Sequence, residues 1–432
     1  MKKNNEQHLL FFLMAFLYST AFTNLLELPI VKNRVQLPEL LFLPIFFFGI
    51  KYLTPVLNFS FFKKYHYIFP FLYVISNLIS SFSSGVLTSV LESFGKIYLF
   101  LVYVIAIEFF SQYKKTDLKQ LIYTHFFNFG LIISGTILIG FCLWAVDIAT
   151  PIGDTELYPY LGKVYRAEGF TRSATMLATL LLMTVSIVFY HFLEKKEKKD
   201  IFLVVLMFFV AVLTFSKSIL LISLNIALLV CWFYLKKYLK YLNAIFIVGA
   251  FFILNIATHY LPIAKNFAEL TKFKAQYISD KIAFSIADFD IYETCYAATK
   301  RESFTVFSRN PILGVGTGNF DTQLEILQKQ GFYSPTLPIY NPHCTYIGAL
   351  AENGFIGFSF LIAFLWVLYK MAKHNIFEKS FDYALYLILV SLLLESWVTD
   401  TMNFRQLWFF FALLVAYHLS TNQGIAQKPL EV

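Results

Sequence analysis

The apolar run that decides the fold is residues 201–235, IFLVVLMFFVAVLTFSKSILLISLNIALLVCWFYL. It holds 35 residues, and its one charged residue is Lys217, between Ser216 and Ser218 near the middle. A bilayer is crossed by about 20 apolar residues in a helix that rises 1.5 Å per residue. The run is too long for one tilted crossing. It therefore predicts two membrane spans joined by a very tight turn at Lys217.

The composition of the whole chain fits the same class of protein. Of 432 residues, 58% are hydrophobic, 14% are charged and 51 are Phe, and the mean hydropathy is +0.63. Soluble domains carry about 25% charged residues. The sequence therefore predicts an all-α integral membrane protein with about twelve transmembrane helices. The predicted spans lie near 9–30, 38–55, 67–84, 97–112, 121–146, 173–193, 201–216, 218–235, 242–260, 345–370, 381–397 and 404–420.

The distribution of Lys and Arg predicts which ends of the spans face the cytoplasm. The net charge of +8 comes from short basic clusters between apolar runs, so a nucleic-acid partner is not expected. With the N-terminus inside, alternate connections hold every basic cluster, as the positive-inside rule requires. Both termini are then cytoplasmic. The clusters are Lys63–Lys64, Lys114–Lys119, Lys195–Lys199, Lys236–Lys240 and Lys370–Lys379.

Two outer connections are long, and they divide the chain. We expect residues 1–260 to form the first nine spans, with a short periplasmic loop at 147–171. Residues 261–344 are expected to form a large helical periplasmic cap loop, and residues 345–432 the last three spans and a cytoplasmic tail. Neither an internal repeat nor paired broken helices of the kind found in transporters is visible in the sequence.

Positive charges on the outer side run against the rule and mark a candidate site. Arg166 lies just before one predicted span, and Lys217 lies in the next outer turn, flanked by hydroxyl groups. A guanidinium binds two phosphate oxygens at once, and an ammonium supplies a point charge. Two such residues on consecutive outer turns indicate an anion site. The alternative is that each side chain extends to the lipid headgroups.

The large outer connection ends in two conspicuous segments. Residues 310–320, NPILGVGTGNF, hold three glycines that either present backbone N–H groups to phosphate or make a tight bend against a helix. His343 follows where the loop enters a span, and an unperturbed imidazole suits a general base at neutral pH; its alternative is a hydrogen-bonded interface residue. Glu352 is nine residues further on, on the opposite face of an unbroken helix. Glu395 lies within a span and needs a partner, for which Arg405 is a candidate.

These motifs together resemble the O-antigen ligase and O-antigen polymerase superfamily of polytopic bacterial envelope glycosyltransferases. The resemblance covers most of residues 160–370, with four motifs in the order in which that superfamily has them. The chain departs from this pattern in three places. Lys217 and Tyr296 stand where Arg is usual, and Thr171-Arg172-Ser173 stands where an Asn-Pro-Asn-like stretch is often seen. The motifs are Arg166-x-x-Gly169, Thr214-x-Ser216-Lys217, Pro311-x-x-Gly314-x-Gly316, and His343 followed by Glu352 and Gly354.

The resemblance implies a GT-C-like fold and an inverting glycosyltransferase without a cofactor. No acidic cluster in the sequence resembles a divalent-metal site, so we expect the reaction to be metal-independent. Its donor is a glycan on undecaprenyl pyrophosphate at the periplasmic face of the inner membrane, and its acceptor is lipid A–core or another glycan. We expect an O-antigen ligase; the alternatives are a polymerase of O-antigen or exopolysaccharide and, more remotely, a transporter or flippase. The implied catalytic residues are His343, Arg166 and Lys217, and the implied substrate-binding residues are Arg172, Ser216, Arg301, Gly314, Gly316 and Glu352.

Four cysteines show no spacing typical of a metal site. Cys142 and Cys231 lie in apolar runs, where they are expected to pack as small apolar side chains. Cys295 and Cys344 both fall in the large outer connection. The sequence leaves open whether these two form a disulfide or remain free thiols, because pairing cannot be deduced from spacing.

Overall fold

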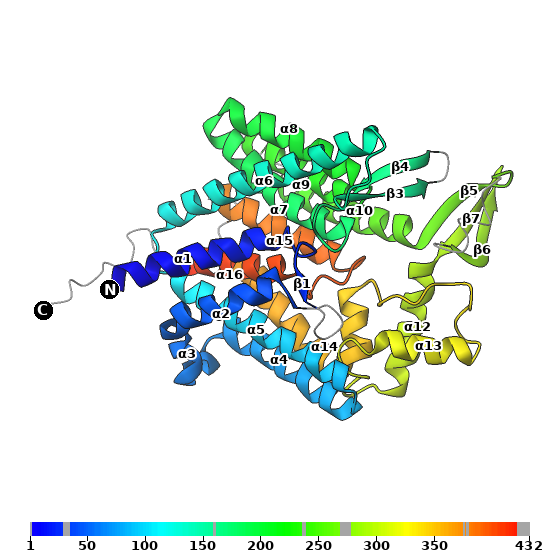
Figure 1. The fold of residues 1–432 in the computed structure, drawn as a ribbon, viewed down its shortest axis with the longest axis horizontal. Helices are drawn as coiled ribbons and strands as arrows, with labels where there is room; N and C mark the ends of the chain where they lie inside the picture. Colours follow the sequence, from blue (N-terminus) through cyan, green and yellow to red (C-terminus); the bar gives the residue numbers. More distant parts are fainter. Residues whose placement is uncertain are drawn as a thin grey trace, which may run out of the picture.

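A computed structural model of the chain describes residues 2–28, 35–158, 161–235, 239–267, 278–374, 376 and 380–420. Its framework is a bundle of long helices (Figure 1). The helices are α1 (Lys2–Ser19), α2 (Leu37–Gly49), α3 (Thr54–Leu57), α4 (Tyr65–Ser84), α5 (Leu87–Phe110), α6 (Lys115–Ala145), α7 (Ala174–Lys195), α8 (Lys198–Leu213), α9 (Ser218–Tyr234), α10 (Leu239–His259), α12 (Cys295–Arg309), α13 (Phe320–Lys329), α14 (Thr345–Ala372), α15 (Ser380–Glu395) and α16 (Arg405–Leu419).

The membrane class predicted from the sequence is confirmed. Within the described residues, seven helical segments are long and apolar enough to cross a bilayer. Each of the twelve predicted spans overlaps a helix, but α1 is not among the seven, and α8, α9, α15 and α16 have 15 to 17 residues. The count of twelve crossings therefore stays a prediction. The seven segments are Leu37–Leu57, Tyr65–Ser84, Leu87–Phe110, Lys115–Ala145, Ala174–Lys195, Tyr241–His259 and Thr345–Ala372.

The apolar run of residues 201–235 folds as two helices, as predicted. Helix α8 ends at Leu213 and α9 begins at Ser218, so only four residues make the turn. Phe215 in this turn has φ of 49°, a left-handed conformation that non-glycine residues seldom adopt. The backbone therefore reverses sharply enough to return the chain into the bundle, and it leaves Lys217 at the tip of the turn.

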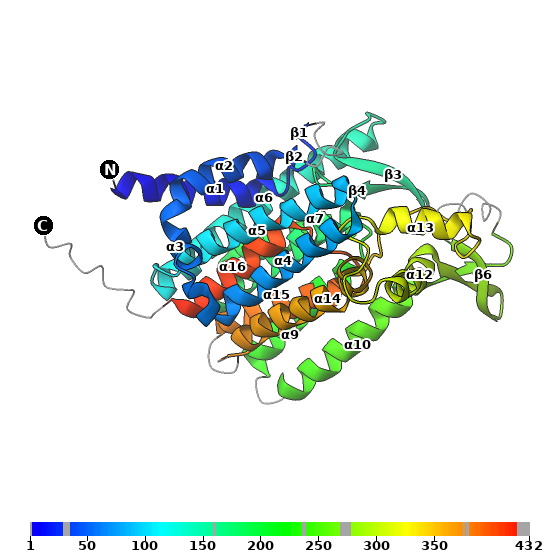
Figure 2. The same ribbon diagram turned by 90° about the horizontal axis from the view of Figure 1, so that it is seen from below.

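Helix α7 lies at the centre of the bundle, and α10 lies at its edge. In the most apolar window of α7, 94% of the residues are buried inside the protein, against 22% for α10. Figures 1 and 2 show the N-terminal end of α1 at one end of the bundle and α12 and α13 beyond the other end. The second of these ends, which the sequence predicts to be periplasmic, also carries the α8–α9 turn.

The large outer connection is not wholly helical, so the prediction of a helical cap was wrong for its first half. Three strands form an antiparallel sheet in the order β5-β7-β6, and α12 and α13 follow. In β6, Ile282, Phe284 and Ile286 alternate with small or polar residues, a period of two that is typical of a strand. The strands are β5 (Tyr260–Ala264), β6 (Ile278–Ile286) and β7 (Phe289–Thr294).

The shorter outer connection also contains a sheet. Strands β3 (Gly153–Tyr158) and β4 (Gly162–Ala167) pair as an antiparallel hairpin in which Asp154 lies opposite Arg166. A further pair of two-residue strands, β1 (Glu27–Leu28) and β2 (Val35–Gln36), links α1 to α2. The all-α description thus holds for the bundle, while the connections that the sequence predicts to be outside contain strands.

Candidate active site

The three predicted catalytic residues line one cavity, at the end of the bundle that the sequence predicts to be periplasmic. The cavity has a volume of about 90 Å³ and lies between the β3–β4 hairpin, the α8–α9 turn, α12 and the start of α14. Arg166, Lys217 and His343 are all in its wall, together with Ser216. The other lining residues are Thr175, Phe215, Ser218, Leu221, Leu254, Tyr296, Glu395, Val398 and Thr399.

Lys217 is a cation in the cavity wall that has no counter-ion among the described residues. Its Nζ atom lies 5.2 Å from the centre of the Tyr296 ring, and within the described residues no carboxylate lies in ion-pair distance of it. Burial, together with the nearby charges of Lys300 and Arg166, lowers the pKa of Lys217 to about 8. A cation held in this way has lost hydration without gaining a counter-ion, so an anionic ligand would stabilise it.

Arg166 joins the hairpin to the α8–α9 turn. Its Nη1 atom donates to Glu156 Oε1 at 2.5 Å, and its Nε atom donates to the backbone oxygen of Thr214 at 3.3 Å. A guanidinium has five N–H donors, so these two contacts leave donors for a ligand. Arg166 therefore both fixes the position of the turn that carries Lys217 and adds a second positive charge to the same cavity.

His343 lies just before α14 in a constrained backbone position. Its φ is 44°, and strain of this kind is found at functional sites. The imidazole contacts the rings of Tyr296 and Tyr340, with ring centres 4.5 Å and 5.5 Å apart. Burial, together with the charges of Lys217 and Lys300, lowers the pKa of His343 to about 4. The imidazole is therefore neutral at physiological pH and has a lone pair free to accept a proton.

Glu395 is a residue of the cavity that sequence reasoning did not place there. It ends α15, is 1% exposed, and its Oε1 atom accepts hydrogen bonds from Ser218 at 2.5 Å and Thr179 at 3.2 Å. The suggestion that Arg405 pairs with it was wrong, because Arg405 donates to Glu39 at 2.6 Å. A carboxylate inside an apolar span was the signal, but the sequence could not say which helix it meets.

Lys300 is a second residue whose importance the sequence did not resolve. It is 6% exposed, and its Nζ atom donates to the backbone oxygen of Trp397 at 2.8 Å. Its charge lowers the pKa of both Lys217 and His343, so it contributes to the positive potential of the cavity. Lys300 lies on α12 next to Arg301, which was the predicted residue.

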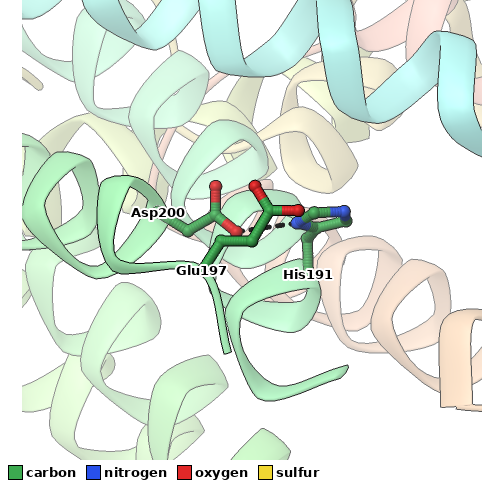
Figure 3. A group of neighbouring side chains, drawn as sticks. All are labelled: His191, Glu197 and Asp200. Carbon is green, nitrogen blue, oxygen red and sulfur yellow. Dashed lines mark hydrogen bonds and ion pairs between the residues drawn. The ribbon is translucent and has the colours of Figure 1, made fainter. Parts of the chain in front are cut away.

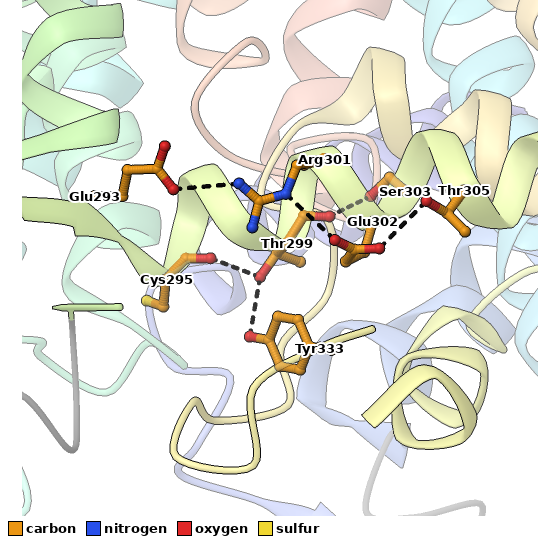
Figure 4. Close-up of polar contacts among 8 residues, drawn as sticks. All are labelled: Glu293, Cys295, Thr299, Arg301, Glu302, Ser303, Thr305 and Tyr333. Atoms are coloured by element: carbon orange, nitrogen blue, oxygen red, sulfur yellow. Dashed lines mark hydrogen bonds and ion pairs between the residues drawn. The ribbon is translucent and has the colours of Figure 1, made fainter. Parts of the chain in front are cut away.

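Arg301 and Arg172 do not line the cavity. Figure 4 shows the Arg301 guanidinium between two carboxylates of the cap, with Glu293 at 3.2 Å and Glu302 at 3.3 Å. The Arg301 side chain is 51% exposed, and Arg172 is exposed as well. The substrate-binding roles of these two arginines stay predictions. Lys300, and not Arg301, is the residue of α12 whose charge lies close to the cavity.

The glycine segment after α12 packs against α14, which favours the tight-bend alternative. The backbone N–H of Gly316 donates to the oxygen of Glu352 at 2.8 Å, and that of Val315 donates to Ala351 at 3.1 Å. A Cβ atom on Gly314 would lie 2.3 Å from the Glu352 backbone carbon. These amides are already committed to α14. Gly314 and Gly316 therefore let the loop pack closely on the α14 backbone, and their substrate-binding roles stay predictions.

Glu352 is separated from His343 by the geometry of α14. His343 precedes the helix, and the helix is broken at Gly354, where φ is 62° and ψ is −168°. Glu352 lines a different, polar cavity of about 20 Å³ with Lys96 and Asp400. The cavity is large enough for about one water molecule. The substrate-binding role of Glu352 stays a prediction.

One group of described residues has the spacing of a metal site, and it lies away from the cavity. His191, Glu197 and Asp200 offer ligand atoms within 4.8 Å of one another at the α7–α8 connection, as Figure 3 shows. Both Asp200 oxygens already accept hydrogen bonds, from Tyr123 at 2.6 Å and from His191 at 2.7 Å. Hydrogen bonding thus accounts for the positions of His191 and Asp200, and Glu197 pairs with Lys199 at 2.7 Å.

The two cysteines of the outer connection are free thiols in this structure. Cys295 and Cys344 are both fully buried. Each is adjacent in sequence to a residue of the cavity wall, Tyr296 and His343. Of the two alternatives left open by the sequence, the structure therefore has the unpaired one, with both thiols packed beneath the candidate site.

Fold and cavity together define a polytopic, mostly helical membrane protein with a cationic pocket at one end of its bundle. A family model described as O-antigen ligase (Wzy_C) matches residues 202–362. The match supports the O-antigen ligase superfamily, so the resemblance inferred from the motifs is confirmed. The matched region includes Lys217 and His343, while Arg166 and Glu395 lie outside it. No curated protein matches the chain.

Proposed function

We propose that the protein transfers a glycan from undecaprenyl pyrophosphate to an acceptor hydroxyl at the periplasmic face of the bacterial inner membrane, most specifically as an O-antigen ligase acting on lipid A–core. The observation that carries this proposal is the meeting of Lys217, Arg166 and His343 in one cavity. The family match supports a glycosyltransferase-like enzyme of the ligase or polymerase kind. The donor, the acceptor and the mechanism are inferred from the chemistry of the cavity.

Lys217 and Arg166 suit the leaving group of such a donor. Pyrophosphate gains negative charge when its bond to the anomeric carbon breaks, and fixed cations stabilise that charge in the transition state. Lys217 has no carboxylate in ion-pair distance among the described residues, so its charge is available to the phosphate. Lys300, buried nearby, strengthens the same positive potential without being in the cavity wall.

His343 suits the acceptor side of the reaction. The acceptor oxygen forms a bond to the anomeric carbon, the bond from that carbon to the pyrophosphate oxygen breaks, and the hydroxyl proton moves to a nitrogen of His343. Undecaprenyl pyrophosphate leaves with the electron pair. Attack opposite the leaving group inverts the anomeric carbon. No step of this displacement uses a metal ion, so the proposed reaction is metal-independent.

An apolar cavity beside the site supports a lipid-linked donor. It has a volume of about 320 Å³ and lies between α10, α14 and α15, with Phe251, Tyr346 and Trp397 in its wall. Two residues in the wall of the candidate active-site cavity, Leu254 and Val398, lie close in sequence to Phe251 and Trp397. A polyprenyl chain whose pyrophosphate lies at Lys217 therefore has apolar surface to follow toward the bilayer.

The phenotype of a deletion strain tests the proposal and separates its two versions. For a ligase, we expect loss of all O-chain from lipopolysaccharide and accumulation of lipid-linked polymer, seen by gel electrophoresis and lipid extraction. A core capped by a single repeat would instead show a polymerase. Lipopolysaccharide of normal chain length and amount, with no change in lipid-linked glycan, would contradict the proposed function.

The proposed orientation is tested by labelling single cysteines in a variant without the four native ones. Lys163 precedes α7 and Lys217 follows α8, and both are proposed to be periplasmic. Lys195, at the end of α7, is proposed to be cytoplasmic. An impermeant thiol reagent should label Lys163→Cys and Lys217→Cys in intact cells, and Lys195→Cys only after permeabilisation. Labelling of Lys195→Cys alone in intact cells would invert the topology and rule out a periplasmic site.

A further inference from the structure

The free oxygen of Glu395 is the feature of the cavity that donor binding does not explain. Oε1 is engaged by Ser218 and Thr179, whereas Oε2 is buried and has no hydrogen-bond partner among the described residues. A buried polar atom without a partner is costly, and more so when it belongs to a carboxyl group. The position of Glu395 in the wall of a cavity indicates that a ligand supplies the hydrogen bond that Oε2 lacks.

Electrostatics indicate what kind of ligand that is. A carboxylate repels a pyrophosphate, so a cavity that served the donor alone would be better without Glu395. Glu395 does not neutralise the cavity's lysine directly either, because it lies beyond ion-pair distance of Lys217. Among the groups that the proposed reaction brings to this cavity, a hydrogen-bond donor without negative charge suits Oε2 best. The hydroxyl groups of a sugar are such donors, and the proposed reaction brings one to this cavity.

We propose that Glu395 binds the acceptor: Oε2 accepts a hydrogen bond from a hydroxyl group of the acceptor sugar and so places the neighbouring, reacting hydroxyl at His343. This inference rests on the proposed function, because it takes the acceptor to be a glycan. Both residues line the same small cavity, and a sugar presents adjacent hydroxyls to two protein groups at once. Glu395 is then a substrate-binding residue, and His343 takes the proton.

Two other roles for Glu395 predict different effects of the same substitutions. As a support, it would hold the α8–α9 turn through Ser218, and any change would act on Lys217 and hence on the donor. As a distant counter-charge, it would weaken donor binding, and its neutralisation would strengthen it. Only acceptor binding predicts an effect confined to the acceptor.

The test is to measure kcat and the KM for each substrate with Glu395→Gln in purified protein. The donor is undecaprenyl-pyrophosphate-linked repeat unit, and the acceptor is lipid A–core extracted from the deletion strain. Gln keeps the shape of the side chain and an oxygen for Ser218 and Thr179, but it replaces a charge-assisted hydrogen bond by a neutral one. We expect the acceptor KM to rise about tenfold and the donor KM to stay within twofold.

Glu194→Gln is the matched control, because Glu194 is paired with Lys119 on the opposite end of α7; it should leave both KM values unchanged. Glu395→Asp withdraws the carboxylate by one methylene and should raise the acceptor KM by a smaller factor. If the Gln variant does not fold, the acceptor KM of Glu395→Asp tests the acceptor role of Glu395. An unchanged acceptor KM, with a raised donor KM in either variant, would reduce Glu395 to a support for the turn. A lowered donor KM alone would make it a counter-charge.

The failure of this inference is distinguishable from failure of the proposed function. If the wild-type protein moves glycan from the lipid-linked donor and the Lys217 variant loses that activity, the proposed function stands whatever Glu395 does. An unchanged acceptor KM in the Glu395 variants then overturns the acceptor role alone. If the wild-type protein moves no glycan from this donor, the proposed function itself fails.

Discussion

Replacement of His343 by asparagine is expected to lower the rate of glycan transfer by about 10²–10⁴-fold, the usual contribution of a general base. Asparagine is the informative choice because it tolerates the left-handed backbone that His343 adopts, with φ of 44°. It keeps a polar side chain but cannot take a proton at neutral pH. Gln should fail as badly, and both variants should still insert into membranes and bind the donor.

The pH dependence gives the same prediction a second measurement. The pKa of His343 is lowered to about 4 by burial and by Lys217 and Lys300, and only the neutral imidazole can accept a proton. The acid limb of kcat/KM, which reports the free enzyme, should therefore fall near pH 4 and not near the ordinary value of 6.5. The phosphates of a bound donor offset the lysine charges, so the acid limb of kcat should lie at higher pH.

The controls for His343 use a neighbouring histidine and the absence of metal. His259 ends α10 outside the cavity wall, and His259→Gln should transfer glycan at the wild-type rate. The assays contain EDTA, since the proposed reaction uses no metal ion; a rate that depends on added Mg²⁺ would contradict that part of the proposal. Near wild-type transfer by His343→Asn would make His343 a positioning residue and move the search for the base elsewhere in the cavity.

Sequence reasoning succeeded where local physical constraints are strong. The length of the apolar run 201–235 requires two helices, and the one charged residue in it has to lie in the turn between them. Arg166, Lys217 and His343 lie at the same end of the bundle because they belong to consecutive connections on one side. That shared end follows from span count and side alone, whereas their meeting in one cavity depends on contacts between the connections.

The residues that sequence reasoning misplaced depend on contacts between distant helices. Arg405 follows Glu395 by ten residues, but the fold turns it toward Glu39, and Glu395 meets Ser218 and Thr179 instead. Lys300 and Arg301 differ by about 100° around α12, so one is buried near the cavity while the other faces the cap surface. The direction in which α12 lies on the bundle decides this, and the chain around Lys300 does not encode it locally.

The strands of the cap were missed for a different reason. Ile282, Phe284 and Ile286 show a period of two, which is a local signal for a strand. Within 84 residues of mixed composition, the apolar positions of α12 and α13 give helical spacing as well, and the helical pattern was extended over the whole connection. The candidate site was little affected, because the β5–β7 sheet contributes no residue to the cavity wall.

Removal of the positive charge at Lys217 is the second change with a large expected effect. Lys217→Ala should reduce transfer by about 10²–10³-fold, as loss of a group that stabilises developing charge typically does. Lys217→Arg should keep transfer within about threefold of wild type, because the charge remains and a guanidinium binds phosphate well. Lys163→Ala, which removes an exposed outer lysine of the β3–β4 hairpin, serves as the control and should have no effect.

The basic limb of the pH profile then separates a phosphate-binding lysine from one that merely reaches for lipid headgroups. The pKa of Lys217 is lowered to about 8 by burial and by the charges of Lys300 and Arg166, so the free enzyme loses this cation as the pH rises through 8. Wild-type kcat/KM should fall above that pH. An arginine stays protonated to beyond about pH 12, so Lys217→Arg should extend the plateau to higher pH. If Lys217→Ala transfers glycan at the wild-type rate at normal expression, the ammonium has no part in the reaction, and the anion site must be built from Arg166 and Lys300 without it.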